Sequence, residues 1–215
     1  MAHEWATRLG DEDMLLLGAR AMYWPARAAL LVADLHLGKG DVFRRAGIGL
    51  PAGGTLHDLT RIDALLDQYP ARTLWVLGDL LHGPLREASW LAQWQQWRLR
   101  HGALDIAVIR GNHDRAMHAG RLLVRDAGER AEEGGFVLRH DPVAEPGRHV
   151  LCGHVHPLCE LPGVGRRFPA FWLRSGLTVL PAFSHFSAGV VAPLRSGEQL
   201  AACVDDAIVA LPVPR

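Results

Sequence analysis

Four short motifs bring together carboxylate, amide and imidazole side chains, which are the groups that hold metal ions in proteins. The first is Asp34-Leu35-His36, and the last, Gly153-His154-Val155-His156, uses the same i, i+2 spacing for two histidines. Side chains two residues apart on an extended strand point the same way, so each pair offers converging ligands. Between them lie Gly78-Asp79-Leu80-Leu81-His82 and Gly111-Asn112-His113-Asp114. Each motif alone is typical of a turn after a strand, but the four together predict a metal centre.

The two middle motifs add groups for chemistry at such a centre. The Asp79 carboxylate has two oxygens and can bridge two cations, and the Asn112 amide oxygen is a neutral ligand for a hard metal. His113 can move a proton near neutral pH. Asp114 could orient His113 or cap the start of a helix, and the sequence leaves both interpretations open.

Each motif follows an apolar run of strand length. Such runs occupy Ala28–Ala33, Thr73–Leu77, Ile106–Ile109, Phe136–Leu138 and His149–Leu151. Five polar residues stand at or just beyond the ends of these runs, namely Asp34, Asp79, Asn112, His140 and His154. In open α/β sheets, ligands bind at the carboxyl ends of the strands. We therefore expect these five side chains to meet at one sheet edge.

The rest of the sequence predicts the elements that support this edge. Apolar residues at helical spacing predict helices over Thr55–Gln68, with Thr55 as N-cap, and over Arg86–Arg100. Helices between buried strands, followed by a run of strands, predict a layered α/β sandwich. Little sequence separates the motifs, so we expect residues 1–215 to form a single domain without a large cap. Further strands are expected in a hairpin over Met14–Leu17 and Ala19–Trp24, and over Phe171–Leu173, Leu177–Leu180 and Gly189–Ala192.

Composition narrows the class of protein. Hydrophobic residues make up 49% of the chain and charged residues 21%, which is ordinary for a soluble globular protein. The formal net charge is zero, so any contact with nucleic acid must be local. Three cysteines with no zinc or redox spacing, and a polar N-terminus, favour the cytoplasm. Every apolar stretch is far shorter than the roughly 20 residues that span a bilayer, so no membrane partner is expected.

The order of the four motifs resembles the signature of the calcineurin-like metallophosphoesterase superfamily, from about Leu30 to Ser187. This resemblance implies a four-layer α-β-β-α sandwich that holds two divalent metal ions. It also implies a lone histidine ligand between the third and last motifs. His140 at a strand end is our choice, ahead of His118 and His149. By analogy, one ion is held by Asp34, His36, Asp79 and His156, and the other by Asp79, Asn112, His140 and His154.

The resemblance implies a two-metal phosphoryl transfer, in which an acidified water attacks phosphorus. His113 then protonates the leaving oxygen or stabilises charge on the phosphoryl group. Oxygen and nitrogen ligands without a thiolate suit manganese, iron or zinc, and we expect manganese. His82 stands where the protein-phosphatase branch has an aspartate, and no arginine follows it. A histidine there resembles the nuclease branch, where it could orient a phosphodiester or donate a supporting hydrogen bond.

Two longer stretches, residues 34–51 and 180–189, resemble the ligase-associated DNA-damage-response metallophosphoesterases. That likeness implies a DNA phosphodiesterase or endonuclease in DNA repair, associated in function with a DNA ligase and a helicase. The second stretch departs from the group, because Ser184-His185 and Ser187-Ala188 replace the expected Gly-Glu and Thr-Gly. Lys39, Arg44 and Arg115 flank the motifs and are predicted to grip substrate phosphates, with ordinary surface ion pairing as the alternative.

Other functions stay open. A small-molecule phosphoesterase, similar to UDP-diacylglucosamine hydrolases or cyclic-nucleotide phosphodiesterases, would use the same centre. A non-catalytic scaffold on the same fold would lose ligands, whereas all seven are present. Three tryptophans at helical spacing, Trp90, Trp94 and Trp97, could stack bases, fill a core or form a homodimer surface.

Overall fold

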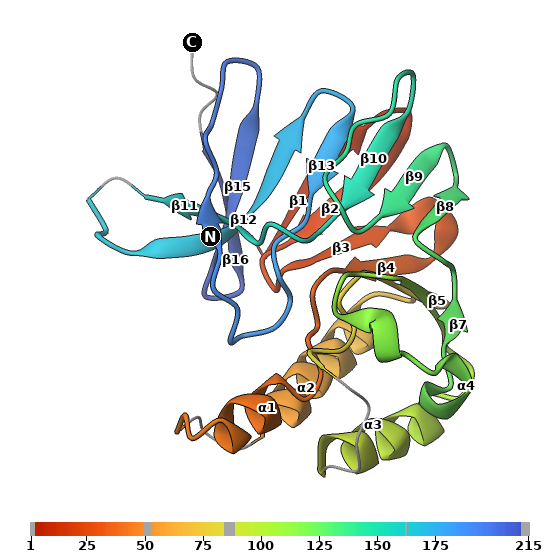
Figure 1. Cartoon of the computed structure of the whole chain (residues 1–215). Coiled ribbons are helices and arrows are strands. Elements are labelled where there is room, and N and C mark those ends of the chain that lie inside the picture. Colours follow the sequence, from red (N-terminus) through yellow and green to blue (C-terminus); the bar gives the residue numbers. More distant parts are fainter. Residues whose placement is uncertain (1–2, 50–52, 84–88, 162, 212–215) are drawn as a thin grey trace.

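Two β-sheets face each other and carry the motifs at one shared edge (Figure 1). The computed structural model describes residues 3–49, 53–83, 89–161 and 163–211. In the seven-stranded first sheet, neighbours are antiparallel from the first to the fourth strand and parallel from the fourth to the seventh. Its strands follow sequence order: β1 (Glu4–Leu9), β2 (Glu12–Leu17), β3 (Ala21–Trp24), β4 (Ala29–Val32), β5 (Thr73–Leu77), β6 (Asp105–Ile109) and β7 (Arg125–Asp126).

Helices cover one face of the first sheet (Figure 1). Side chains alternate along β4, so Leu30 packs toward the helices and Leu31 toward the second sheet. Trp94 is fully buried in the helical layer and donates a hydrogen bond to the Leu122 carbonyl. The helices are α1 (Lys39–Arg45), α2 (Gly54–Gln68), α3 (Ser89–Arg100) and α4 (Ala119–Leu122), with short 3-10 turns η1 (Pro25–Arg27) and η2 (Asp114–Ala116).

The second sheet is built from the second half of the chain. Along its main path the strand order is β14 (Val190–Val191), β11 (Pro157–Glu160), β12 (Arg167–Arg174), β13 (Leu177–Val179), β10 (His149–Cys152), β9 (Phe136–Arg139) and β8 (Arg130–Glu133). A further hairpin, β15 (Gln199–Val204) and β16 (Ala207–Ala210), pairs with β12. Strands β9, β10 and β13 run parallel, so the two strands that precede His140 and Gly153 end side by side.

A core of large apolar side chains lies between the sheets. Trp24 of β3 packs edge-on against Phe136 of β9, with ring centroids 5.1 Å apart. Leu31, Trp75 and Phe171 belong to the same cluster and are buried. Each such side chain stabilises the fold by roughly 1.5–3 kcal/mol, so this core holds the two sheets together. The Trp24–Phe136 contact lies at the edge opposite the motifs, because Trp24 pairs with the first residue of β4 and Phe136 is the first residue of β9.

Most predicted elements are confirmed, with shifts of a few residues at their ends. The predicted helix over Arg86–Arg100 is observed from Ser89, and its first three residues lie outside the described part. Thr55 is not an N-cap, because α2 is preceded by Gly53 in a left-handed conformation and the Thr55 hydroxyl accepts a hydrogen bond from Gly38 N instead. The tryptophan stripe of α3 is core, as one of the three interpretations held: Trp90, Trp94 and Trp97 are all buried.

The expected second helical layer is not found in the part of the chain that the structure describes. Residues 123–161 and 163–211 contain strands and loops, and all four helices lie earlier. The link between parallel strands β9 and β10 is only residues 140–148, with Pro142 and Pro146 inside it. Such a short, proline-containing link cannot form the usual crossover helix. Within the described residues, no helix is long and apolar enough to cross a membrane.

Candidate metal centre

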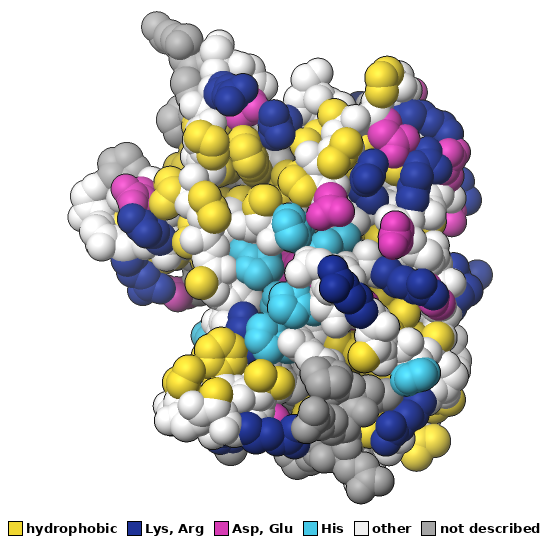
Figure 2. Space-filling model, in the orientation of Figure 1, with side chains coloured by type: hydrophobic (Ala, Val, Ile, Leu, Met, Phe, Trp, Pro, Cys, Tyr) yellow, Lys and Arg dark blue, Asp and Glu magenta, His cyan; other side chains and the backbone are white. Residues whose placement is uncertain are grey.

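The predicted ligands gather where the two sheets meet. Asp34, Asp79 and Asn112 follow the parallel strands β4, β5 and β6, while His140 and His154 follow the parallel strands β9 and β10. Because each group of strands runs in one direction, all five positions reach the same edge, as expected. In Figure 2 the histidine side chains cluster in the middle of one face, beside an indentation of the surface. Asp34, Asp79 and His140 are buried beneath this face, whereas the side chains of His113 and His154 are 39% and 40% exposed.

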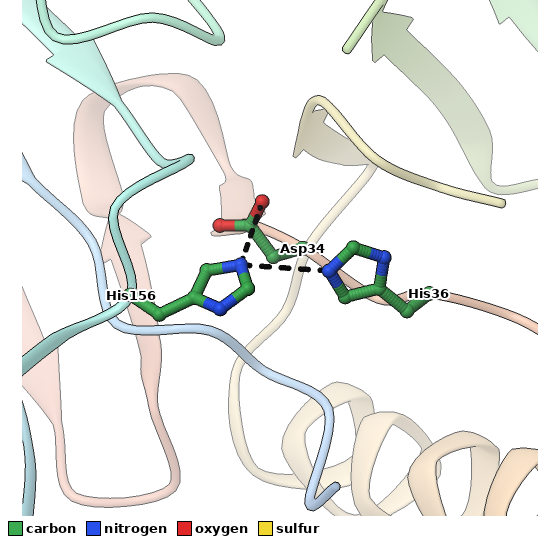
Figure 3. A group of neighbouring side chains, drawn as sticks. All are labelled: Asp34, His36 and His156. Atoms are coloured by element: carbon green, nitrogen blue, oxygen red, sulfur yellow. Dashed lines mark hydrogen bonds and ion pairs between the residues drawn. The ribbon is translucent and has the colours of Figure 1, made fainter. Parts of the chain in front are cut away.

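One group of ligand atoms comes from Asp34, His36 and His156 (Figure 3). His156 Nε2 lies 3.4 Å from Asp34 Oδ1 and 3.4 Å from His36 Nε2. Asp34 is fully buried, and His36 is only 4% exposed. Burial lowers the pKa of His36 to about 2, with help from the Lys39 charge and nearby histidines. The ring is therefore neutral and can offer a lone pair.

A second group comes from Asn112, His140 and His154. His140 Nε2 lies 2.9 Å from Asn112 Oδ1 and 2.9 Å from His154 Nδ1. Asp79 lies between the two groups, with Oδ1 3.6 Å from His140 Nε2 and Oδ2 3.9 Å from His36 Nε2. One carboxylate thus faces both groups, which is the position that a bridging ligand requires.

Backbone carbonyls set the ring orientation of two histidines. His140 Nδ1 lies 3.2 Å from Leu77 O, and His156 Nδ1 lies 2.7 Å from Ala188 O. A carbonyl oxygen can only accept, so Nδ1 carries the proton in both rings and Nε2 of each neutral ring is left with a lone pair. Each Nε2 faces a carboxylate or amide oxygen, which cannot donate to it, and also a nitrogen of a neighbouring imidazole. This is the arrangement that supports metal-binding histidines.

The arrangement of the donor atoms suits cation binding better than hydrogen bonding among these atoms. Asp34 Oδ1 is buried and accepts no hydrogen bond, although a buried polar atom without a partner is costly. Burial opposes protonation of His156, but the adjacent Asp34 carboxylate outweighs this and raises its pKa. The site therefore attracts positive charge. Together with clusters of His and Asp that fit two ions, these observations support a binuclear centre for divalent metals.

The backbone around the centre is strained. Five of the predicted ligand residues have a left-handed backbone conformation, which residues other than glycine rarely adopt: Asp34, His36, Asp79, His154 and His156. Each costs roughly 1–2 kcal/mol. Such outliers cluster at functional sites, where surrounding structure holds them in place.

Gly78 makes room for His140, since a Cβ on Gly78 would overlap the His140 ring.

His113 and His82 lie beside the first group of ligand atoms. The His113 side chain is 39% exposed, and its Nε2 lies 4.0 Å from Asp79 Oδ2. The His82 ring stacks on the His113 ring, with centroids 5.0 Å apart, and Phe43 of α1 also stacks on His82, with centroids 5.7 Å apart. Burial lowers the pKa of His82 to about 4, with smaller contributions from Lys39 and His113. His82 is therefore a neutral ring at pH 7.

Asp114 does not contact the His113 side chain. Its carboxylate is buried and accepts hydrogen bonds from the backbone N–H groups of Leu80, Leu81 and Gly111. Asp114 is the first residue of the 3-10 turn η2, and no side-chain hydrogen bond caps the start of this turn. Neither sequence interpretation holds, because Asp114 ties the second motif to the third instead.

The three predicted substrate-binding cations differ in their surroundings. Burial lowers the pKa of Lys39, and the carboxylates of Asp34 and Asp79 oppose this shift. The Lys39 amine therefore interacts electrostatically with the centre. Arg44 forms an ion pair with Asp41 in the same helix. Arg115 is exposed in η2 and forms no ion pair within the described residues.

The structure also sorts the alternative histidines and adds a residue. His118 is exposed at the start of α4, and His149 contacts the Thr178 hydroxyl, so neither reaches the ligand groups. Asp141 was missed, although it directly follows His140; its Oδ1 lies 3.9 Å from His154 Nε2 and joins a third possible ligand cluster.

Comparisons with known proteins bear on this centre. Residues 29–173 match the family model of calcineurin-like phosphoesterases. The crystal structure of Pseudomonas putida nuclease MPE is 34% identical, with a TM-score of 0.86 over 97% of this chain and 100% of that chain. A protein of unknown function, AQ665 from Aquifex aeolicus, is 19% identical, with a TM-score of 0.40 over 60% of this chain and 78% of that chain. No curated protein matches.

Proposed function

The chain belongs to the calcineurin-like phosphoesterase family, and from this premise we propose that it is a two-metal phosphodiesterase that cleaves DNA as an endonuclease. The observation that carries the proposal is the likeness to a nuclease over nearly the whole length of both chains. Phosphodiesters as substrates also agree with His82, which stands where phosphoprotein phosphatases have an aspartate.

The proposed metal ligands are the two groups that share Asp79. One ion would be held by Asp34, His36, Asp79 and His156, and the other by Asp79, Asn112, His140 and His154. When bound, two divalent ions supply positive charge that acidifies water and stabilises the phosphoryl oxygens. We propose manganese as the native metal, because the donor set is oxygen and nitrogen only.

His113 is the proposed general acid. It is close enough to Asp79 to reach the reacting phosphate, and it is exposed enough to meet a leaving oxygen from outside. The neutral His82 ring stacks on it and would hydrogen-bond a phosphoryl oxygen or the leaving group. Phe43 also stacks on His82, so we expect the two histidines to act as one stacked unit.

The open surface of the site suits a polymer. A single domain without a large cap leaves the ligands accessible, as a DNA strand requires. Lys39 and Arg115 are proposed to contact phosphates next to the cleaved bond. Arg44 belongs to the same proposal, although its ion pair with Asp41 would have to open or be shared.

The wider setting belongs to the same proposal. The likeness of residues 34–51 and 180–189 to ligase-associated phosphoesterases supports a role in DNA repair, in functional association with a DNA ligase and a helicase. We propose the cytoplasm as its location. A homodimer stays part of the proposal, but the α3 tryptophans cannot be its surface because they are buried.

An activity panel tests the proposed function. The manganese-loaded protein is offered bis-nitrophenyl phosphate, nitrophenyl phosphate, cyclic nucleotides, a UDP-linked sugar, and single- and double-stranded DNA. We expect turnover of the diester and internal cleavage of DNA. Turnover of monoesters alone, or of one small diester without DNA, would replace the nuclease by a small-molecule phosphoesterase. No turnover with any metal would indicate a scaffold.

A further inference from the structure

Arg20 lines a cavity that is separate from the metal centre. The cavity has a volume of about 380 Å³. It is bounded by the β2–β3 turn, helix α2, the start of β12, the β15–β16 turn and His185 of the loop after β13. Three arginines from three different elements line it, namely Arg20, Arg61 and Arg166.

Two of these arginines have no acidic partner in the described part of the chain. Arg61 is engaged, because it binds Asp58 at 3.1 Å and two backbone carbonyls. Arg20 donates only to the Ser184 carbonyl, at 3.3 Å, and no carboxylate lies within 4.0 Å of it. Arg166 lies over the Phe168 ring at 4.5 Å and likewise has no ion pair. Asp205 and Asp206 line the same cavity but do not reach either guanidinium.

Arg20 is a partly buried cation on a strained backbone. Burial lowers the pKa of Arg20, and the neighbouring Arg61 charge lowers it further, while Asp58 and Asp206 at longer range oppose this. Its backbone also has a φ of 65°, the left-handed region, in a hairpin turn where glycine or asparagine is preferred. A partly buried guanidinium that lines a cavity and has no ion pair within the described residues is available to bind an anion.

The cavity and the metal centre lie against the same loop. Ser184 N donates to Asp34 O at 3.3 Å, while Ser184 O accepts from Arg20. Four residues further along the loop, the Ala188 carbonyl accepts from His156. One loop therefore contacts both the cavity and the metal centre.

We propose that this cavity binds a second phosphate of the DNA strand, away from the bond that is cleaved, through the guanidinium groups of Arg20 and Arg166. The inference rests on the proposed function, since it takes a polynucleotide as the substrate. Guanidinium groups match phosphate oxygens in geometry and charge. Such a contact fixes the strand in register without reading its bases.

The test compares Arg20→Gly and Arg166→Gln with wild type and with Arg72→Gln. Arg72 is exposed just before β5, at the sheet edge opposite the metal ligands, so its variant removes the same charge elsewhere. Glycine at position 20 relieves the left-handed backbone, so this variant should fold; Arg166 is exposed, so its variant provides a second reading. Two measurements are made: binding of a fluorescent single-stranded oligonucleotide by EDTA-treated protein, and manganese-dependent kcat/KM on oligonucleotide and on bis-nitrophenyl phosphate.

We expect each cavity variant to weaken oligonucleotide binding and kcat/KM by about fivefold to twentyfold, and to lower the salt slope of binding by about 0.7. Turnover of bis-nitrophenyl phosphate, which has no second phosphate, should match wild type, and Arg72→Gln should change neither. Unchanged oligonucleotide binding in both cavity variants overturns the inference, whether or not the wild type cleaves DNA. A wild type that binds DNA through the cavity but cleaves only small diesters defeats the proposed function alone. Stabilisation by inorganic phosphate that is lost in Arg20→Gly, without any effect on DNA, would mark a free-phosphate site and also overturn the inference.

Discussion

At the scale of single residues, a variant of His113 tests the proposed catalysis separately from the proposed metal binding. Its ring is half-exposed beside Asp79 and is not among the ligand groups. We expect His113→Ala to lower kcat by roughly 10²–10⁴-fold, the usual contribution of a general acid. Metal content, measured by mass spectrometry, should stay at the wild-type value. His118→Ala is the control, because His118 is exposed at the start of α4. Full activity in His113→Ala would remove it from the mechanism.

Asp34 offers a second test at this scale, because its buried Oδ1 lacks a partner. Without metal, Asp34→Asn removes a buried charge that is only partly compensated, by the His154 N–H and the nearby His156 ring, so the variant should melt close to the wild-type temperature. With manganese, wild type should gain several degrees and the variant little, because binding to the native state adds to its stability. Thermal melts with EDTA and with manganese measure both. A wild type that is indifferent to manganese would contradict the metal centre itself.

At the scale of elements, the turn after β5 depends on glycine for space. Gly78 has a φ of 84°, and a Cβ there would overlap the His140 ring. Gly47 has a similar φ of 79°, but nothing lies within 4 Å of its Cβ position. Gly47→Ala should therefore cost about 1 kcal/mol of unfolding free energy for the backbone alone. Gly78→Ala should cost about 1–3 kcal/mol more from overpacking, as measured by urea unfolding. Equal losses would mean that the His140 ring moves aside freely.

The first residue of β10 links stability to pH. Burial lowers the pKa of His149, whose ring contacts the Thr178 hydroxyl. The unfolded chain takes up a proton near pH 6.5 while the native ring does not, so His149 stabilises the fold above that pH and this contribution is lost as the pH falls. The loss is at most about 1.4 kcal/mol per pH unit for one proton. In urea unfolding between pH 7.5 and 5.5, His149→Gln should lose less stability than wild type. A parallel pH dependence in both proteins would rule this out.

The elements that could be predicted from sequence were those with a single strong pattern. Continuous apolar runs mark β4, β5 and β6, because these strands are buried on both faces. The edge strand β1 has an exposed face and a mixed sequence, so it was missed. Strand β15 is buried but has the pattern QLAACV, which could equally form a helix.

The same distinction explains which parts of the site were foreseen. Each predicted ligand lies within a few residues of a strand end, so local sequence was enough to find it. The Ala188 carbonyl, Phe43 and Arg20 join the site or its cavity through contacts far along the chain. No local pattern marks such residues, because only tertiary packing brings them near. Asp141 is the exception, since its place next to His140 was visible in the sequence.

At the scale of the whole molecule, the cysteines report whether the chain unfolds as one unit. Cys203 lies between the sheets, while Cys152 and Cys159 lie in two other apolar clusters of the second sheet. Burial raises the pKa of Cys203 to about 12 and that of Cys159 to about 11, and it also raises the pKa of Cys152. Native protein at pH 8 should therefore show no reaction with a disulfide reagent. Along a urea gradient all three thiols should react in one transition. Separate transitions would reveal independently unfolding parts.

The distribution of the ligands over the two sheets has a consequence for how the chain can be divided. Asp34, His36, Asp79 and Asn112 come before β7, and the three remaining histidines come after β8. A cut between these strands would leave each fragment with one sheet and part of the proposed ligand set of each ion. If the proposed ligand assignment and activity hold, two such fragments would form a split enzyme, in which bound cations join the halves and activity measures their association.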